Sequence, residues 1–137
     1  MKWNSKNVLL SCGADINAYV ISFNQQTKKW KGSLVNIPGN GLRALTCCDW
    51  SKDGDRFAIG GGTGELYIGY FYQEKNQWDT CPVSIGKNTI ATVKFHPTET
   101  NVLAATSIDE NLTVLNIDIK NINKYISFKE GDAVGEA

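Results

Sequence analysis

An internal repeat is the feature that most constrains the fold of this 137-residue chain. Residues 8–21 align without a gap with residues 102–115, at an offset of 94 residues, and both segments contain an Asp-x-Asn motif. A third copy lies between them, because residues 50–59 match residues 95–104 at an offset of 45 residues. The segment Trp3–Val8 is the same element with a turn two residues shorter. A period of 45–49 residues is in or near the range of four-stranded β-propeller blades.

The apolar residues of each repeat occur in short runs, rich in β-branched and aromatic side chains and separated by turn residues. Such runs are typical of strands packed on both faces, and no segment has a helical period. First strands are expected at Leu42–Trp50 and Thr89–Phe95, second strands at Val8–Cys12, Phe57–Gly61 and Val102–Thr106, third strands at Ala18–Phe23, Leu66–Phe71 and Leu112–Ile117, and fourth strands from near Trp30 and Trp78. The second-strand residues Leu9, Ile59 and Leu103 are expected to be nearly buried between blades.

The repeats predict an all-β partial propeller over residues 1–128. Its blades are expected at about 1–38, 39–86 and 87–128. Propellers close with about four to eight blades, so three blades form an open wedge that is marginally stable and prone to self-association. Because Trp3 falls within the first strand of a blade, the start of the chain is expected to be cut. Residues 129–137 are small, polar and glycine-containing, which predicts a disordered tail.

Composition and charge narrow the class of partner. The 14 basic and 14 acidic side chains give zero net charge, so no long-range field favours nucleic acid or an anionic membrane. The apolar run Val8–Leu10 is shorter than the roughly 7–15 residues of a secretory signal, and no run approaches the roughly 20 residues of a membrane helix. A soluble, intracellular protein is expected. A disulfide framework is conceivable, but buried thiols are the favoured interpretation of the four cysteines, Cys12, Cys47, Cys48 and Cys81.

Asp15 and Asp109 are predicted to lie in the tight turns between second and third strands. A carboxylate at such a position accepts hydrogen bonds from turn amides and fixes the hairpin. The middle repeat has Gly64 at the corresponding place, so its turn must be held by backbone geometry. Both aspartates are therefore assigned a structural role and not a catalytic one.

A basic cluster around an aromatic residue, formed by Lys28, Lys29, Trp30 and Lys31, follows a polar hairpin. One interpretation is a solvated hairpin whose tryptophan packs on its neighbour. The other is a contact for an acidic segment of a partner protein.

No motif in the chain predicts catalysis. His96 is the only histidine and precedes Pro97 in a predicted turn, without a nucleophile motif such as Gly-x-Ser-x-Gly. No Cys-x-x-Cys pair is available for a zinc site. The glycine-rich residues 60–64 lack the Lys-Ser/Thr of a phosphate-binding loop and open into a strand, which favours a hairpin turn. The sequence therefore predicts no enzyme, no cofactor and no metal.

The general signature of WD repeats is weak in this sequence, but a more specific resemblance is present. In their order and spacing, four segments are similar to subunit 1, the β-propeller subunit, of the actin-related protein 2/3 complex. They are residues 12–20 (CGADINAYV), 70–78 (YFYQEKNQW), 93–97 (VKFHP) and 101–105 (NVLAA). The Lys-Trp-Lys of residues 29–31 also falls where that family starts a fourth strand. The resemblance extends from about Trp3 to Lys124.

The resemblance implies WD-repeat-like blades and a non-enzymatic scaffold that supports actin filament nucleation and branching. It implies contacts with the other subunits of the complex, with the actin filament and with nucleation-promoting factors, in the cytoplasm at the actin cytoskeleton. The family's filament-contacting insert lies in a later blade and has no counterpart here. The alternative is a WD-repeat interaction module of an unrelated assembly, such as one in trafficking or RNA processing. An enzyme built on a propeller has the least support.

Overall fold

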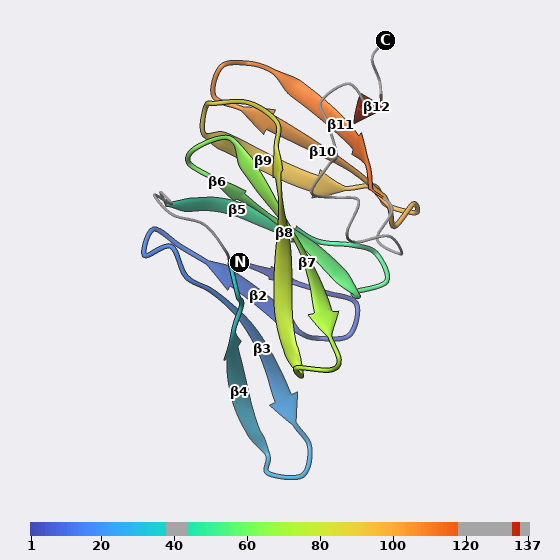
Figure 1. Ribbon diagram of the computed structural model, residues 1–137. Coiled ribbons are helices and arrows are strands. Elements are labelled where there is room, and N and C mark those ends of the chain that lie inside the picture. The colour runs from blue at the N-terminus through green and yellow to red at the C-terminus, as the bar shows by residue number, and fades with distance from the viewer. Residues whose placement is uncertain (38–43, 118–132, 135–137) are drawn as a thin grey trace.

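The computed structural model describes residues 1–37, 44–117 and 133–134, which form three four-stranded antiparallel sheets. Figure 1 shows the sheets side by side, the first in blue to dark teal, the second in teal, green and yellow-green, and the third in yellow, orange and red. Within each sheet the strands follow one another in chain order. The described residues contain no helix, and hence none that could span a bilayer.

The strands reproduce the repeats predicted from the sequence. The first sheet contains β1 (Lys2–Trp3), β2 (Leu9–Cys12), β3 (Ala18–Asn24) and β4 (Lys29–Leu34). The second contains β5 (Leu45–Trp50), β6 (Arg56–Gly61), β7 (Glu65–Tyr72) and β8 (Gln77–Ser84). The third contains β9 (Ile90–Phe95), β10 (Val102–Ser107), β11 (Leu112–Asn116) and β12 (Ala133–Val134). The all-β class is confirmed.

Parts of the predicted organisation lie outside the described residues. These parts are the junction of the first two blades at residues 38–39 and the end of the third at residue 128. Of the tail predicted to be disordered, the structure describes Ala133–Val134, which instead forms β12 and pairs with Val114 and Leu115 of β11. The third sheet thus gains a fourth strand that the sequence analysis did not place.

Two apolar cores fill the spaces between the sheets. The core between the first and second sheets includes Leu10, Val20, Trp50, Phe57, Ile59 and Tyr67. The core between the second and third includes Ala58, Leu66, Ile68, Val93, Phe95, Leu103 and Leu115. Residues from both faces of the second sheet belong to these cores, which explains why Phe57–Gly61 is buried without alternation.

The position of Leu9 differs from the prediction. Ile59 and Leu103 are 0% and 1% exposed, as expected, but Leu9 is only partly buried. Leu9 pairs with Trp3 and lies on the face of the first sheet that turns away from the second. Among the described residues no sheet packs on that face, so the buried position of this strand is Leu10.

The turn between first and second strands lengthens by one residue from each sheet to the next. Its flanking pairs are Trp3 with Leu9, Trp50 with Phe57, and Phe95 with Leu103. Phe57 and Leu103 are therefore equivalent, and the gapless match of residues 50–59 with 95–104 is wrong by one residue beyond the turn. The match of residues 8–21 with 102–115 agrees with the register.

Candidate protein-interaction site

The turns predicted to contain Asp15 and Gly64 are stabilised differently: the first by a side-chain hydrogen bond, the second by its backbone conformation. Asp15 Oδ1 accepts a hydrogen bond from the backbone N–H of Asn17 at 3.3 Å, and Ile16 between them has a φ of 60°. Gly64 has a φ of 84°, and a Cβ there would lie 2.4 Å from the carbonyl oxygen of Gly86. Backbone conformation and this close approach both require glycine at position 64.

Asp109 has more hydrogen-bond donors around it than Asp15. Its Oδ1 accepts hydrogen bonds from the hydroxyl of Ser107 and from the backbone N–H of Asn111. Its Oδ2 accepts from the side-chain amides of Asn88 at 2.8 Å and Asn111 at 2.9 Å. The hydrogen bonds from Ser107 and then Asn88 lower the pKa of Asp109. The importance of both aspartates for the stability of their turns stays a prediction.

The four residues of the basic cluster are all exposed, but they do not form one patch. Lys28 has a φ of 58° and closes the β3–β4 hairpin by donating its backbone N–H to the carbonyl of Asn24 at 2.8 Å. Because successive side chains of a strand point to opposite faces, Lys29 and Lys31 lie on one face of β4 and Trp30 on the other.

Trp30 belongs to an exposed aromatic cluster on the outer face of the first sheet. Its ring centroid is 5.2 Å from that of Phe23 and 6.0 Å from that of Trp3. Trp3 and Trp30 are 58% and 57% exposed, and Phe23 is 37% exposed. With Asn7 and Gln25 the three rings line a shallow groove. Exposed aromatic groups with a polar rim are typical of protein-interaction surfaces.

The second sheet contains the same cluster, and there the first sheet covers Trp50 and part of Trp78, whereas Phe71 stays 40% exposed. Trp50, Phe71 and Trp78 are the counterparts of Trp3, Phe23 and Trp30. The centroid of Trp78 is 5.6 Å from Trp50 and 5.4 Å from Phe71, and Trp50 is only 5% exposed. Trp30 was among the predicted contact residues but its two companions were not, although the aromatic residues recur at spacings of 47 and 48 residues.

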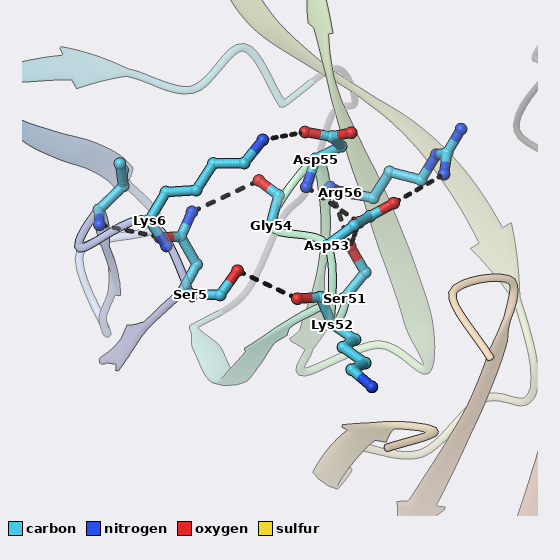
Figure 2. Close-up of polar contacts among 10 residues, drawn as sticks. Ser5, Lys6, Ser51, Lys52, Asp53, Gly54, Asp55 and Arg56 are labelled. Carbon is cyan, nitrogen blue, oxygen red and sulfur yellow. Dashed lines mark hydrogen bonds and ion pairs between the residues drawn. The ribbon is translucent and has the colours of Figure 1, made fainter. Parts of the chain in front are cut away.

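Polar contacts also join a turn of the first sheet to a turn of the second (Figure 2). Lys6 Nζ lies 2.6 Å from Asp55 Oδ1, and the hydrogen bond and charge of Asp55 raise the pKa of Lys6. The hydroxyl of Ser5 donates to the carbonyl of Lys52 at 3.1 Å. Both members of the ion pair are more than half exposed, so the pair contributes little to stability.

Asp53 organises the second of these turns (Figure 2). Its Oδ1 accepts hydrogen bonds from the hydroxyl of Ser51 at 2.5 Å and from the backbone N–H of Asp55 at 3.1 Å. Burial raises the pKa of Asp53, but these hydrogen bonds and the nearby charge of Arg56 outweigh burial and lower it overall.

Each junction between sheets also has a hydrogen bond between a side chain of one sheet and the backbone of the neighbouring sheet. The indole N–H of Trp50 donates to the carbonyl of Lys2 at 3.0 Å. The carboxylate of Asp49 accepts from the backbone N–H of Phe95 at 2.7 Å. First strands of adjacent sheets are therefore joined by polar contacts as well as by apolar packing.

His96 and the cysteines have surroundings that fit structural positions. His96 Nδ1 accepts hydrogen bonds from the backbone N–H groups of Thr98 at 3.1 Å and Glu99 at 3.0 Å, within its own turn. The four cysteines form no disulfide in the described chain. Burial raises the pKa of the Cys47 thiol. No group of three or more potential metal ligands occurs among residues 1–37, 44–117 and 133–134.

Comparison with known proteins agrees with this architecture. No family model matches the chain. Actin-related protein 2/3 complex subunit 1A-B of Xenopus laevis is 33% identical over 117 residues, covering 85% of this chain and 30% of that protein. Subunit 1A of Arabidopsis thaliana is 32% identical, covering 88% and 31%. Protein sof1 of Schizosaccharomyces pombe is 31% identical, covering 84% and 24%.

The fold also occurs in a solved structure. The C-terminal WD40 domain of Sif2 superposes with a TM-score of 0.63 at 18% identity, covering 83% of this chain and 32% of that one. The chain spans about a third of the length of the subunit 1 proteins that it matches. It is therefore an array of WD-repeat-like β-propeller blades, similar over most of its length to part of actin-related protein 2/3 complex subunit 1.

Proposed function

We propose that the chain is a non-enzymatic scaffold subunit of an actin-related protein 2/3 complex. In this role it holds other subunits through protein–protein contacts and supports nucleation and branching of actin filaments, in the cytoplasm at the actin cytoskeleton. The observation that carries the proposal is the similarity to subunit 1 of an animal and of a plant over more than four-fifths of the chain. Packed sheets support it, because a repeat array offers extended surfaces for partners.

Within this role, the lysines of the β3–β4 hairpin are proposed to contact an acidic segment of a partner. Lys29 and Lys31 lie together on one face of an exposed strand, and Lys28 lies in the turn beside them. None of the three has an ion pair in the described structure. Exposed like charges of this kind steer an oppositely charged partner and fix its orientation.

Reconstitution tests the scaffold role directly. The tagged 137-residue chain is mixed with the purified remaining subunits of an actin-related protein 2/3 complex and passed over a size-exclusion column. Co-elution with those subunits, together with faster actin polymerisation than without the chain, is the expected result. A folded chain that elutes apart from them contradicts the proposal. Co-elution without faster polymerisation retains the scaffold and rejects the support of nucleation.

The lysine contact has its own test in the same assay. Replacing Lys29 and Lys31 with glutamate should weaken co-elution, most strongly at low ionic strength, because surface attraction is screened by salt. Lys75→Glu in the corresponding β7–β8 hairpin is the matched control and should bind like the unmodified chain. Equal binding of all variants contradicts the lysine contact.

The similarity to protein sof1 favours a second candidate, a WD-repeat-like interaction module of a different assembly. Affinity purification of the tagged chain from its own cells distinguishes the two candidates. Recovery of actin-related proteins supports the first, and their absence beside a different, reproducible set of partners supports the second.

A further inference from the structure

The two faces of each sheet differ in chemistry. One face of the second sheet has large rings, Trp50, Phe57 and Trp78, and packs on the first sheet. Its opposite face has Ala58, Leu66 and Ile68 and packs on the third sheet. We call these the aromatic face and the aliphatic face.

At every junction in the described chain, the aliphatic face of one sheet packs on the opposite kind of face of the next sheet. That face carries the aromatic or otherwise larger side chains. At the first junction, Leu10, Ala18 and Val20 of the first sheet meet the aromatic face of the second. At the second junction, the aliphatic face of the second sheet meets Phe95, Leu103 and Leu115 of the third. The same rule of association therefore applies twice.

The two outermost faces of the described array are complementary by this rule. The aromatic face of the first sheet, with Trp3, Phe23 and Trp30, is exposed. The opposite end of the array is the aliphatic face of the third sheet. Its residues Ala104 and Val114 are partly exposed, and Leu112 is 65% exposed. Ala104 and Val114 also line an apolar groove beside Pro97 and Val102.

We propose that this chain forms a head-to-tail dimer in which the aliphatic face of the third sheet of each copy packs on the aromatic face of the first sheet of the other. Two such contacts join six sheets into one closed ring, and about four to eight blades close a propeller. A head-to-tail contact that closes gives a discrete assembly, not a filament. The proposal does not rest on the function proposed above.

The hydrogen bond at the first junction also predicts an equivalent polar contact in the dimer. Trp50 donates its indole N–H to the carbonyl of Lys2, the residue before Trp3 in β1. The counterpart of Trp50 in the first sheet is Trp3, and the counterpart of Lys2 in the third sheet is Lys94, the residue before Phe95. The indole of Trp3 is thus placed to donate to the carbonyl of Lys94 of the second copy.

Sedimentation equilibrium of the purified 137-residue chain over a range of concentrations tests the proposal. The expected result is a reversible equilibrium between monomer and a species of twice its mass. Trp30→Glu and Leu112→Glu should each shift this equilibrium toward monomer by about a hundredfold or more, because each places a charge in both apolar contacts of its homodimer. The matched control is Ile108→Glu in the β10–β11 turn, since Ile108 is also 65% exposed but lies on neither face. It should dimerise normally.

Mixing the two variants distinguishes this dimer, in which different faces meet, from one in which the same face of each copy meets. A Trp30→Glu copy retains its aliphatic face and a Leu112→Glu copy its aromatic face, so the mixture should form a weak heterodimer with one intact contact. Circular dichroism of each variant confirms that it is folded. The proposal is overturned by a folded monomer at all concentrations, by a dimer that neither substitution weakens, by larger polymers, or by a mixture of variants that stays monomeric.

Discussion

Gly69 occupies the position in the second sheet where an added methyl group would cause the most serious collision. A Cβ at this position would lie 2.2 Å from Cε1 and Cζ of Phe57. The Phe57 ring is completely buried, and its centroid is 5.3 Å from that of Trp50 and 5.5 Å from that of Trp78. Because rings on both sides prevent it from moving, Gly69→Ala should destabilise the chain by about 1–3 kcal/mol, the usual cost of overpacking a core.

The third sheet shows how the cost can be relieved. Phe57 pairs with Gly69, whereas the equivalent pair in the third sheet is Leu103 with Leu115. The smaller leucine side chain therefore tolerates a side chain opposite. In a Phe57→Leu background, Gly69→Ala should cost at least about 1 kcal/mol less than it does alone, a coupling typical of residues in contact.

Urea unfolding followed by tryptophan fluorescence at one fixed protein concentration measures this double-mutant cycle. Gly32→Ala is the control within a strand, because a Cβ there would meet Ile21 Cγ1 at an ordinary 3.7 Å. It should be neutral or slightly stabilising. A loss below about 0.5 kcal/mol for Gly69→Ala, or additivity within about 0.3 kcal/mol, would refute the argument from ring packing.

Three further predictions concern buried area, backbone conformation and charge. At a concentration where the chain is monomeric, Leu103→Ala should cost about 2–5 kcal/mol in urea unfolding, whereas Leu112→Ala, at a 65% exposed position, should stay within about 0.5 kcal/mol of the unmodified chain; equal losses would contradict the assignment of faces. Gly64→Ala should lower the melting temperature far more than Gly86→Ala, because only the first has a positive φ and a close backbone contact. The lowered pKa of Asp109 means that its charged form stabilises the fold above its ordinary pKa, and that this contribution is lost as the pH falls through the folded-state pKa. Melting temperatures of Asp109→Asn and the unmodified chain should therefore differ most near neutral pH and converge in acid; a gap independent of pH would contradict this.

Strand positions were predictable because the sequence repeats its apolar runs. The second strands begin within one residue of the predicted positions, and the third strand of the first sheet begins at Ala18 as expected. Burial depends on what lies beside a strand, and a local pattern does not contain that information. Leu9 and Leu103 occupy equivalent positions, yet only Leu103 has a sheet packed against it.

The candidate site was less predictable than the fold. Lys29, Trp30 and Lys31 are adjacent in sequence, but strand geometry separates the lysines from the tryptophan. The aromatic face combines residues from β1, β3 and β4, and its parts become neighbours only through strand pairing. Comparing aromatic positions between repeats could have identified it, since Trp3 and Phe23 recur as Trp50 and Phe71.

The hydrogen bond from Trp50 to the carbonyl of Lys2 has a consequence for how such arrays arise. Every amino acid supplies a backbone carbonyl, so the acceptor does not depend on which side chain occupies position 2. A duplicated gene segment that encodes one more sheet with a tryptophan at this place would find its acceptor already present. Growth of the array by tandem duplication would then require complementary apolar faces but no matching mutation in the neighbouring strand.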